Sequence, residues 1–213
     1  MLKNRSHQNS LTSLASAIAA VSVLCLWCSV PAWANDADEI AEAFAATYKN
    51  LPYRNASIFV DDCQISIRVE TLSNCTDPVQ AAAYSYFVDL KHNAPRTGRD
   101  RPRIDGDMWA LSVRFERFGT WIDESRRINR RSDEILAAAR REMGWGPDAA
   151  YAAASQFLRE VDIEDIRDWE SREYCSGGVT FMPSLRRLRL RSPDLNPATD
   201  ALARYSNECG ASQ

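Results

Sequence analysis

The chain has 213 residues, and its 29 acidic residues outnumber 26 basic ones, for a net charge of −3. This length fits one domain, or one domain with a helical extension. The mildly acidic balance argues against general nucleic-acid binding, which depends on neutralising phosphates with lysine and arginine.

The first 34 residues have the pattern of a secretory signal peptide. Lys3 and Arg5 precede a small, apolar run over 11–30, and Ala32-Trp33-Ala34 supplies the small residues of a cleavage site. An uncleaved anchor is the alternative, because the run approaches the roughly 18–20 residues that span a bilayer. We expect cleavage, which removes two basic residues and no acid and so changes the charge from −3 to −5. The remaining chain is then periplasmic or secreted, with no transmembrane segment.

The cysteines divide between the leader and the mature chain. The C-x-x-C motif Cys25-Leu26-Trp27-Cys28 lies inside the leader, so it gives no reason to predict redox or zinc chemistry. Four cysteines remain, Cys63, Cys75, Cys175 and Cys209, and an even number in an exported chain predicts two disulfides. Of the three possible pairings we favour Cys63–Cys75 and Cys175–Cys209, because each closes a local loop.

The N-terminal half begins with a helix and continues with strands. Ile40, Phe44 and Tyr48 form one apolar stripe and predict a helix over 36–50. Alternation of apolar and polar residues then predicts strands over 57–60, 63–69, 84–90 and 109–115.

Three further segments of this half are less regular. Asp77-Pro78 resembles a helix start, but the aromatic and β-branched residues that follow favour a strand over 84–90 in the ambiguous segment 77–90. The polar stretch 92–107 predicts a long loop, for which we favour a solvated hairpin connection over a ligand-binding loop. Trp121-Ile122 is interpreted as the start of another short strand.

The C-terminal half has a helical period. It predicts helices that begin at Ser132 and Pro147, a short helical piece over 163–169 and a final helix over 197–209 with Leu202 and Tyr205 buried. Segregated strands and helices predict an α+β fold. We therefore expect an N-terminal helix packed on a small antiparallel sheet over 35–125, followed by a helical part over 126–213 on the same domain.

No residue is predicted to be catalytic. His92 is the one histidine outside the leader, no G-x-S-x-G motif accompanies it, and no free cysteine is expected. A histidine-based zinc site fails on ligand count, and the acidic run over 160–170 lacks the spacing of a calcium loop. That run is expected to be a solvated helix face paired with Arg159 and Arg167. The glycines lack the spacing of phosphate-binding loops, so we predict no metal and no cofactor.

Two basic clusters, 126–131 and 186–191, remain as candidates for binding. In the second, Arg186, Arg187, Arg189 and Arg191 alternate with leucines and could meet an unknown protein, an anionic membrane or another envelope component. Pairing with the acidic residues of 160–173 inside the molecule is the competing interpretation.

The sequence favours a non-catalytic binding or interaction module. Two alternatives stay open: a small carboxylate-dependent hydrolase and an envelope-associated structural protein. Two carboxylates about 5–10 Å apart in one cleft would favour the hydrolase. Docking through the 186–191 arginines would favour the structural role.

Overall fold

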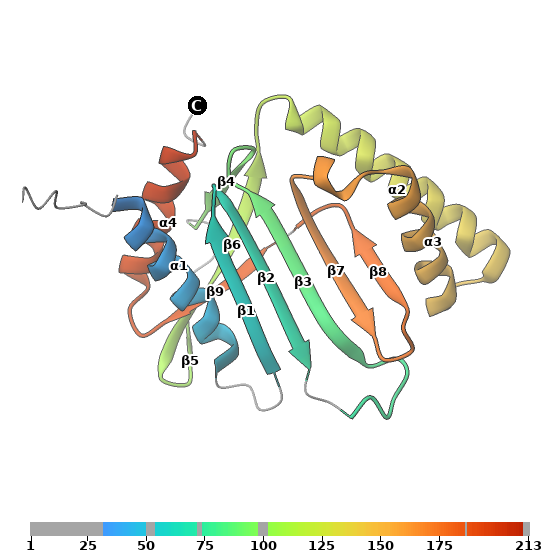
Figure 1. Ribbon diagram of the computed structural model, residues 1–213, viewed down its shortest axis with the longest axis horizontal. Coiled ribbons are helices and arrows are strands. Elements are labelled where there is room, and N and C mark those ends of the chain that lie inside the picture. Colours follow the sequence, from blue (N-terminus) through green and yellow to red (C-terminus); the bar gives the residue numbers. More distant parts are fainter. Residues whose placement is uncertain (1–31, 50–53, 72–73, 98–101, 186, 211–213) are drawn as a thin grey trace, which may run out of the picture.

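The computed structural model describes residues 32–49, 54–71, 74–97, 102–185 and 187–210 (Figure 1). The elements of the N-terminal half are α1 (Ala32–Lys49), β1 (Arg54–Asp61), β2 (Gln64–Thr71), β3 (Ala81–Asp89), β4 (Asn93–Arg96), β5 (Arg103–Asp105) and β6 (Met108–Arg117). They are followed by α2 (Trp121–Met143), α3 (Pro147–Glu160), the 3₁₀ turn η1 (Ile163–Asp165), β7 (Asp168–Tyr174), β8 (Val179–Met182), β9 (Leu188–Ser192) and α4 (Leu195–Glu208).

The predicted leader falls mostly outside this description. Residues 1–31 are not among the described residues, and residues 32–34 belong to the first turn of α1, which begins four residues before the predicted start at 36. Within the ranges given above, no helix is both long enough and apolar enough to cross a membrane.

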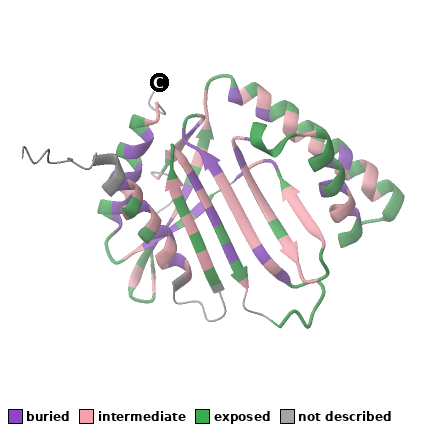
Figure 2. Ribbon diagram, viewed as in Figure 1, coloured by how far each residue is buried: buried purple, intermediate pink, exposed green. Residues whose placement is uncertain are grey.

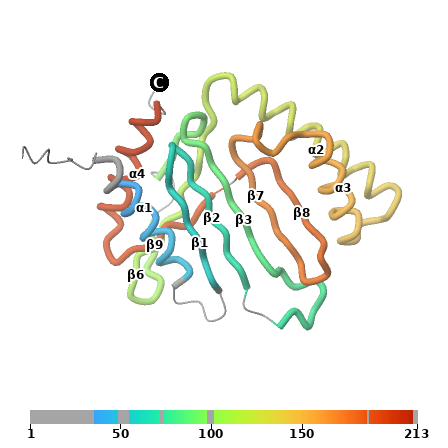
Figure 3. The backbone as a smooth tube through the Cα atoms, in the orientation of Figure 1, coloured from blue at the N-terminus to red at the C-terminus, as the bar shows by residue number. Residues whose placement is uncertain are grey.

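The larger sheet has five antiparallel strands in the order β1-β2-β3-β7-β8. β7 lies beside β3, and β8 beside β7, although both are far from β3 in sequence (Figure 3). The helices α1 and α4 lie at the β1 end of this sheet, and α2 and α3 lie at the β8 end (Figure 1). The ambiguous segment is thus resolved, because β3 is the strand that we predicted over 84–90.

The smaller sheet is built around β6. β4 and β5 pair with different parts of β6 in the order β4-β6-β5, and β9 also pairs with β6. The stretch 92–107 is therefore not one long loop, since it contains both β4 and β5. Cross-strand hydrogen bonds satisfy backbone groups there that a loop would leave to water.

The main core lies between the larger sheet, the smaller sheet and the two terminal helices. Ile65, Ile67 and Val69 alternate along β2 and are almost fully buried, and Ile40 and Phe44 of α1 pack with them (Figure 2). Leucines of β6, β9 and α4 complete the same cluster: Leu111, Leu188, Leu190 and Leu202. Burial of each such side chain stabilises the fold by about 1.5–3 kcal/mol.

A second core cluster forms where the α2–α3 hairpin meets the sheet. Trp121 and Ile135 of α2 pack with Phe157 of α3 and with Ile166, which precedes β7. Trp121 is 1% exposed and begins α2, so our interpretation of it as the start of a strand is wrong.

The C-terminal half is α+β rather than helical throughout. The predicted helices over this half correspond to α2, α3 and α4, and Leu202 and Tyr205 are buried as expected. The helix α2 begins at Trp121 rather than at the predicted Ser132, so the basic cluster 126–131 lies within this helix. However, the half also supplies β7, β8 and β9, and the predicted helical piece over 163–169 is only η1 followed by the start of β7. The α+β class itself is confirmed.

The disulfides join all four predicted cysteines in a pairing that differs from ours. The bridges are Cys63–Cys209, 146 residues apart in sequence, and Cys75–Cys175, 100 residues apart. β3 pairs with β7, so the turn before β3 meets the turn after β7. Cys63 lies in the two-residue turn between β1 and β2, where its backbone N–H donates to the Tyr205 hydroxyl of α4 at 3.1 Å. Our local pairing was wrong because it assumed that each half folds on its own.

Candidate functional site

Two of the four candidate arginines support the fold. Arg189 Nη2 lies 2.6 Å from Asp105 Oδ2, and Arg191 Nη2 donates to the Asp105 carbonyl oxygen at 2.7 Å. The Arg191 side chain is only 11% exposed. Both arginines thus pair inside the molecule, but with β5 rather than with the acidic residues of 160–173.

Arg187 is the candidate that remains accessible. It is exposed, and within the described part of the chain it forms no ion pair. It lies between β8 and β9 and lines two adjoining hollows on the surface. Arg186 lies outside the described residues.

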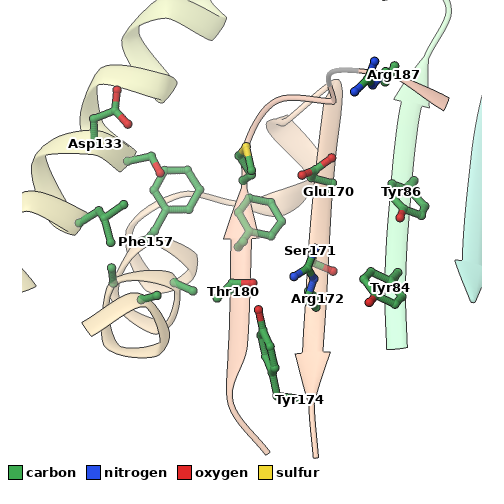
Figure 4. A pocket seen from close by; sticks show the side chains of 17 residues that line it. Tyr84, Tyr86, Asp133, Phe157, Glu170, Ser171, Arg172, Tyr174, Thr180 and Arg187 are labelled. Carbon is green, nitrogen blue, oxygen red and sulfur yellow. The ribbon is translucent and has the colours of Figure 1, made fainter. Parts of the chain in front are cut away.

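The larger hollow is an open pocket of about 610 Å³ between the larger sheet and the α2–α3 hairpin. Figure 4 shows side chains of β3 and β7 on one side, helix residues such as Asp133 and Phe157 on the other, and Arg187 and Tyr174 at opposite ends. The helical wall is largely apolar: Leu136, Ala150, Ala153, Ala154 and Phe157. This pocket is our main candidate site.

Cross-strand pairing explains why polar side chains meet at the sheet wall. One row across β2, β3, β7 and β8 consists of Val69, Tyr84, Arg172 and Thr180, and the next row of Ile67, Tyr86, Glu170 and Met182. Residues directly opposite each other share a face of the sheet. The face that is apolar and buried on β2 therefore becomes aromatic and charged on β3 and β7, where the pocket opens.

Arg172 is held among tyrosine rings. Its guanidinium carbon lies 5.0 Å from the centroid of the Tyr84 ring and 6.0 Å from that of Tyr174. Burial lowers the pKa of Arg172, but hydrogen bonding to Tyr174 and the fields of Tyr84 and Tyr86 outweigh burial, so that the pKa is raised. Arg172 therefore stays cationic and presents a positive charge with flat aromatic neighbours.

Tyr174 is itself fixed by the helical wall. Its ring packs against Tyr151 of α3 with the centroids 5.2 Å apart. Gly178 makes this contact possible, because a Cβ at that position would overlap the Tyr151 ring. The contact with Tyr151 thus holds Tyr174, which lies at one end of the pocket (Figure 4).

The smaller hollow, of about 500 Å³, is basic. Its lining residues are Arg114, Phe115, Arg117, Ser184, Leu185 and Arg187, with no carboxylate among them. The Ser184 backbone N–H donates to the Met182 carbonyl oxygen at 2.7 Å, which fixes the turn after β8. This lining favours an anion over a cation.

Asp168 organises the region behind the smaller hollow. Its carboxylate accepts two hydrogen bonds from Arg117, at 2.9 and 2.7 Å, one from Trp121 Nε1 at 2.8 Å and one from the Leu185 backbone N–H at 2.9 Å. The acidic run over 160–170 is therefore not one solvated helix face. It contains a buried carboxylate that joins β6, α2 and the turn after β8 to β7.

Other predicted chemistry lies away from the hollows. His92 Nε2 is 3.9 Å from Asp89 Oδ2, in the turn after β3, and lines neither hollow. All four cysteines outside the predicted leader are in disulfides. The residues that the structure describes contain no group of three or more His, Cys, Asp or Glu placed to hold a metal ion.

Sequence reasoning missed Tyr84, Tyr86 and Arg172 as site residues. The two tyrosines alternate along a recognised strand, and this alternation was the available signal for a shared face. Arg172 gave no signal, since its position depends on the pairing of β7 with β3.

Comparison of the chain with protein-family models, with curated proteins and with solved structures finds no match.

Proposed function

We propose that this protein is an exported binding protein whose pocket between β3, β7, β8 and the α2–α3 hairpin holds a small organic molecule. One observation carries the proposal: a sheet face that is apolar and buried on β2 turns aromatic and charged where it opens into a pocket of about 610 Å³. Ligand pockets are commonly about 300–1,000 Å³ and combine apolar walls with a few polar groups.

The lining indicates the shape and chemistry of the ligand. Phe157 and Phe181 stack with their centroids 5.6 Å apart, and beside the alanines of α3 they offer a flat apolar surface. Arg172 and Thr180 offer hydrogen-bond donors across from that surface. A molecule with an apolar or aromatic body and at least one polar group suits both walls.

Export is supported by two independent features. The first 34 residues have the composition of a cleavable leader, and two disulfides join distant parts of the fold. Disulfides persist in oxidising compartments, so a periplasmic or secreted location is part of the proposal.

Native mass spectrometry tests the proposal. The exported protein, purified without denaturation, is incubated with the small-molecule fraction of its host's culture and envelope, and bound masses are read. The test variant Ala150→Phe fills the pocket from α3, and the control Ser155→Phe places the same side chain on the exposed part of that helix. We expect wild type and Ser155→Phe to retain a ligand and Ala150→Phe to lose it. No retained mass, or a mass retained equally by all three proteins, contradicts the proposal.

A hydrolase is the second candidate, and one observation favours it. Asp133 of α2 and Glu170 of β7 both line the pocket, so it contains two carboxylates, the residue type that glycoside hydrolases use in pairs. Hydrolysis of chromogenic aryl glycosides that is abolished separately by Asp133→Asn and Glu170→Gln would support this role. Absence of turnover together with a retained ligand leaves the binding function.

A further inference from the structure

Arg187 lines both hollows. This shared residue indicates which chemical groups the ligand contains. The larger hollow has an apolar wall and the smaller one has three arginines. A single molecule that extends past Arg187 would have its body in the first hollow and its end in the second.

The positive charge of the arginines in the smaller hollow is only partly neutralised by carboxylates of the protein. Arg117 is neutralised by Asp168, to which it is bound through two hydrogen bonds. Arg187 has no such partner among the described residues. Arg114 lines the same hollow and brings a third guanidinium group to it.

Buried contacts hold the backbone of the turn that lines the smaller hollow. Leu185 is 4% exposed, and its backbone is held by Asp168, so Ser184 and Arg187 extend from an anchored turn. An anchored backbone lowers the part of the entropic cost of binding that comes from ordering the turn itself.

We infer that the ligand is an amphipathic oxyanion, such as an organic phosphate or carboxylate, with its apolar body in the larger pocket and its anionic group beside Arg187, Arg114 and Ser184. The inference rests on the proposed function, because the body occupies the pocket proposed there. Guanidinium groups bind phosphate and carboxylate through paired, charge-assisted hydrogen bonds, which makes arginine suited to this task.

Isothermal titration calorimetry with three probes tests the inference. The probes are 1-naphthyl phosphate, which has both parts, 1-naphthol, which lacks the anion, and inorganic phosphate, which lacks the body. Wild type should bind 1-naphthyl phosphate more tightly than either fragment. Arg187→Gln should reduce affinity for 1-naphthyl phosphate by about ten- to a hundredfold and leave 1-naphthol unchanged.

Matched variants separate this inference from the proposed function. Arg159→Gln removes an exposed arginine of α3 that lines neither hollow and should change no affinity. Ala150→Phe should abolish binding of both naphthyl probes. Equal affinities for 1-naphthol and 1-naphthyl phosphate, no binding of the phosphate ester, or an unchanged preference in Arg187→Gln each overturn the inference. Binding of 1-naphthol that Ala150→Phe abolishes would still support the pocket as a binding site.

Discussion

Arg117 and Asp168 form a bidentate ion pair at the junction of the two sheets, with Nε–Oδ1 at 2.9 Å and Nη2–Oδ2 at 2.7 Å. The Asp168 side chain is 2% exposed, and it also accepts hydrogen bonds from Trp121 and Leu185. One carboxylate therefore satisfies donors from three other segments, and its loss leaves all of them unpaired in a buried place.

The first prediction follows from that arrangement. Asp168→Ala should lower the free energy of unfolding by about 3–5 kcal/mol, because the Arg117 charge loses its partner. Asp168→Asn should cost less, since the amide oxygen still accepts a hydrogen bond. Urea denaturation measures both. Glu142→Ala, at an exposed position near the end of α2, serves as the control and should change stability by less than about 0.5 kcal/mol. Equal effects at the two positions would contradict the role of Asp168.

The second prediction concerns pH and the outer face of the larger sheet. Arg68 of β2 donates to both oxygens of Glu173 of β7, at 2.6 and 3.1 Å. Hydrogen bonding to Arg68 lowers the pKa of Glu173, and burial opposes this only in part. A folded-state pKa below the unfolded value stabilises the protein above the unfolded pKa, about 4.3, and this contribution is lost as pH falls through the folded pKa.

Thermal unfolding between pH 7 and pH 2 tests this linkage. Wild type should have a higher melting temperature than Glu173→Gln at pH 7, and the difference should shrink as the pH falls below about 4. The pair is partly exposed, so the difference should be small and weaker in high salt. Glu142→Gln should follow the wild-type curve at every pH. A difference that is independent of pH would count against the ion pair.

The disulfides give the third prediction. Non-reducing peptide mapping should recover Cys63–Cys209 and Cys75–Cys175 peptides and no free thiol. Replacing both cysteines of either bridge by serine should cost about 4–5 kcal/mol, since each bridge closes a loop of a hundred residues or more in the unfolded chain. A Cys63–Cys75 peptide would show that the strand order is wrong.

The extent to which the sequence predicts this fold depends on the strand considered. β2 alternates Ile65, Ile67 and Val69 with polar residues, so its character and buried face were evident. β7 was not evident, because four of its seven residues are charged and one face of it lines a pocket instead of a core. A strand that serves a polar site loses the apolar alternation by which strands are recognised.

The disulfide pairing and the site were missed for the same reason. Cys75 and Cys175 meet only because β7 pairs with β3, and the same pairing brings Arg172 to Tyr84. Local patterns carry no information about which strand lies beside which. Arg187 could be selected from the sequence as part of a basic cluster, but its separation from Arg189 and Arg191 depends on Asp105 of β5.

The fourth prediction tests the support of Tyr174 at one end of the pocket. Gly178→Ala should displace the Tyr151 ring, because the added methyl group would occupy its position, and should cost about 1–3 kcal/mol. Affinity for 1-naphthyl phosphate should fall with it, since Tyr174 loses its support. Gly146→Ala is the matched control, because a Cβ there meets no atom within 4 Å. Similar losses in both variants would mean that the effect is not specific to Tyr151.

The fifth prediction joins the proposed leader to the fold. Asp36 accepts hydrogen bonds from Arg204 of α4, with Nη2–Oδ1 at 2.6 Å and Nε–Oδ2 at 3.1 Å, and its side chain is 5% exposed. Cleavage after Ala34 retains this pair, whereas cleavage two residues later removes it. Intact-mass analysis of the exported protein should therefore give an N-terminus at Asn35.

A chain that begins at Ala37 should be less stable by about 1 kcal/mol, because Arg204 is half exposed and recovers part of its hydration. Asp38 is the control, because its side chain is exposed and forms no ion pair among the described residues. Asp38→Ala should leave the denaturation midpoint of the Asn35 chain unchanged. An N-terminus beyond Asp36 would show that the Asp36–Arg204 pair is not part of the mature protein.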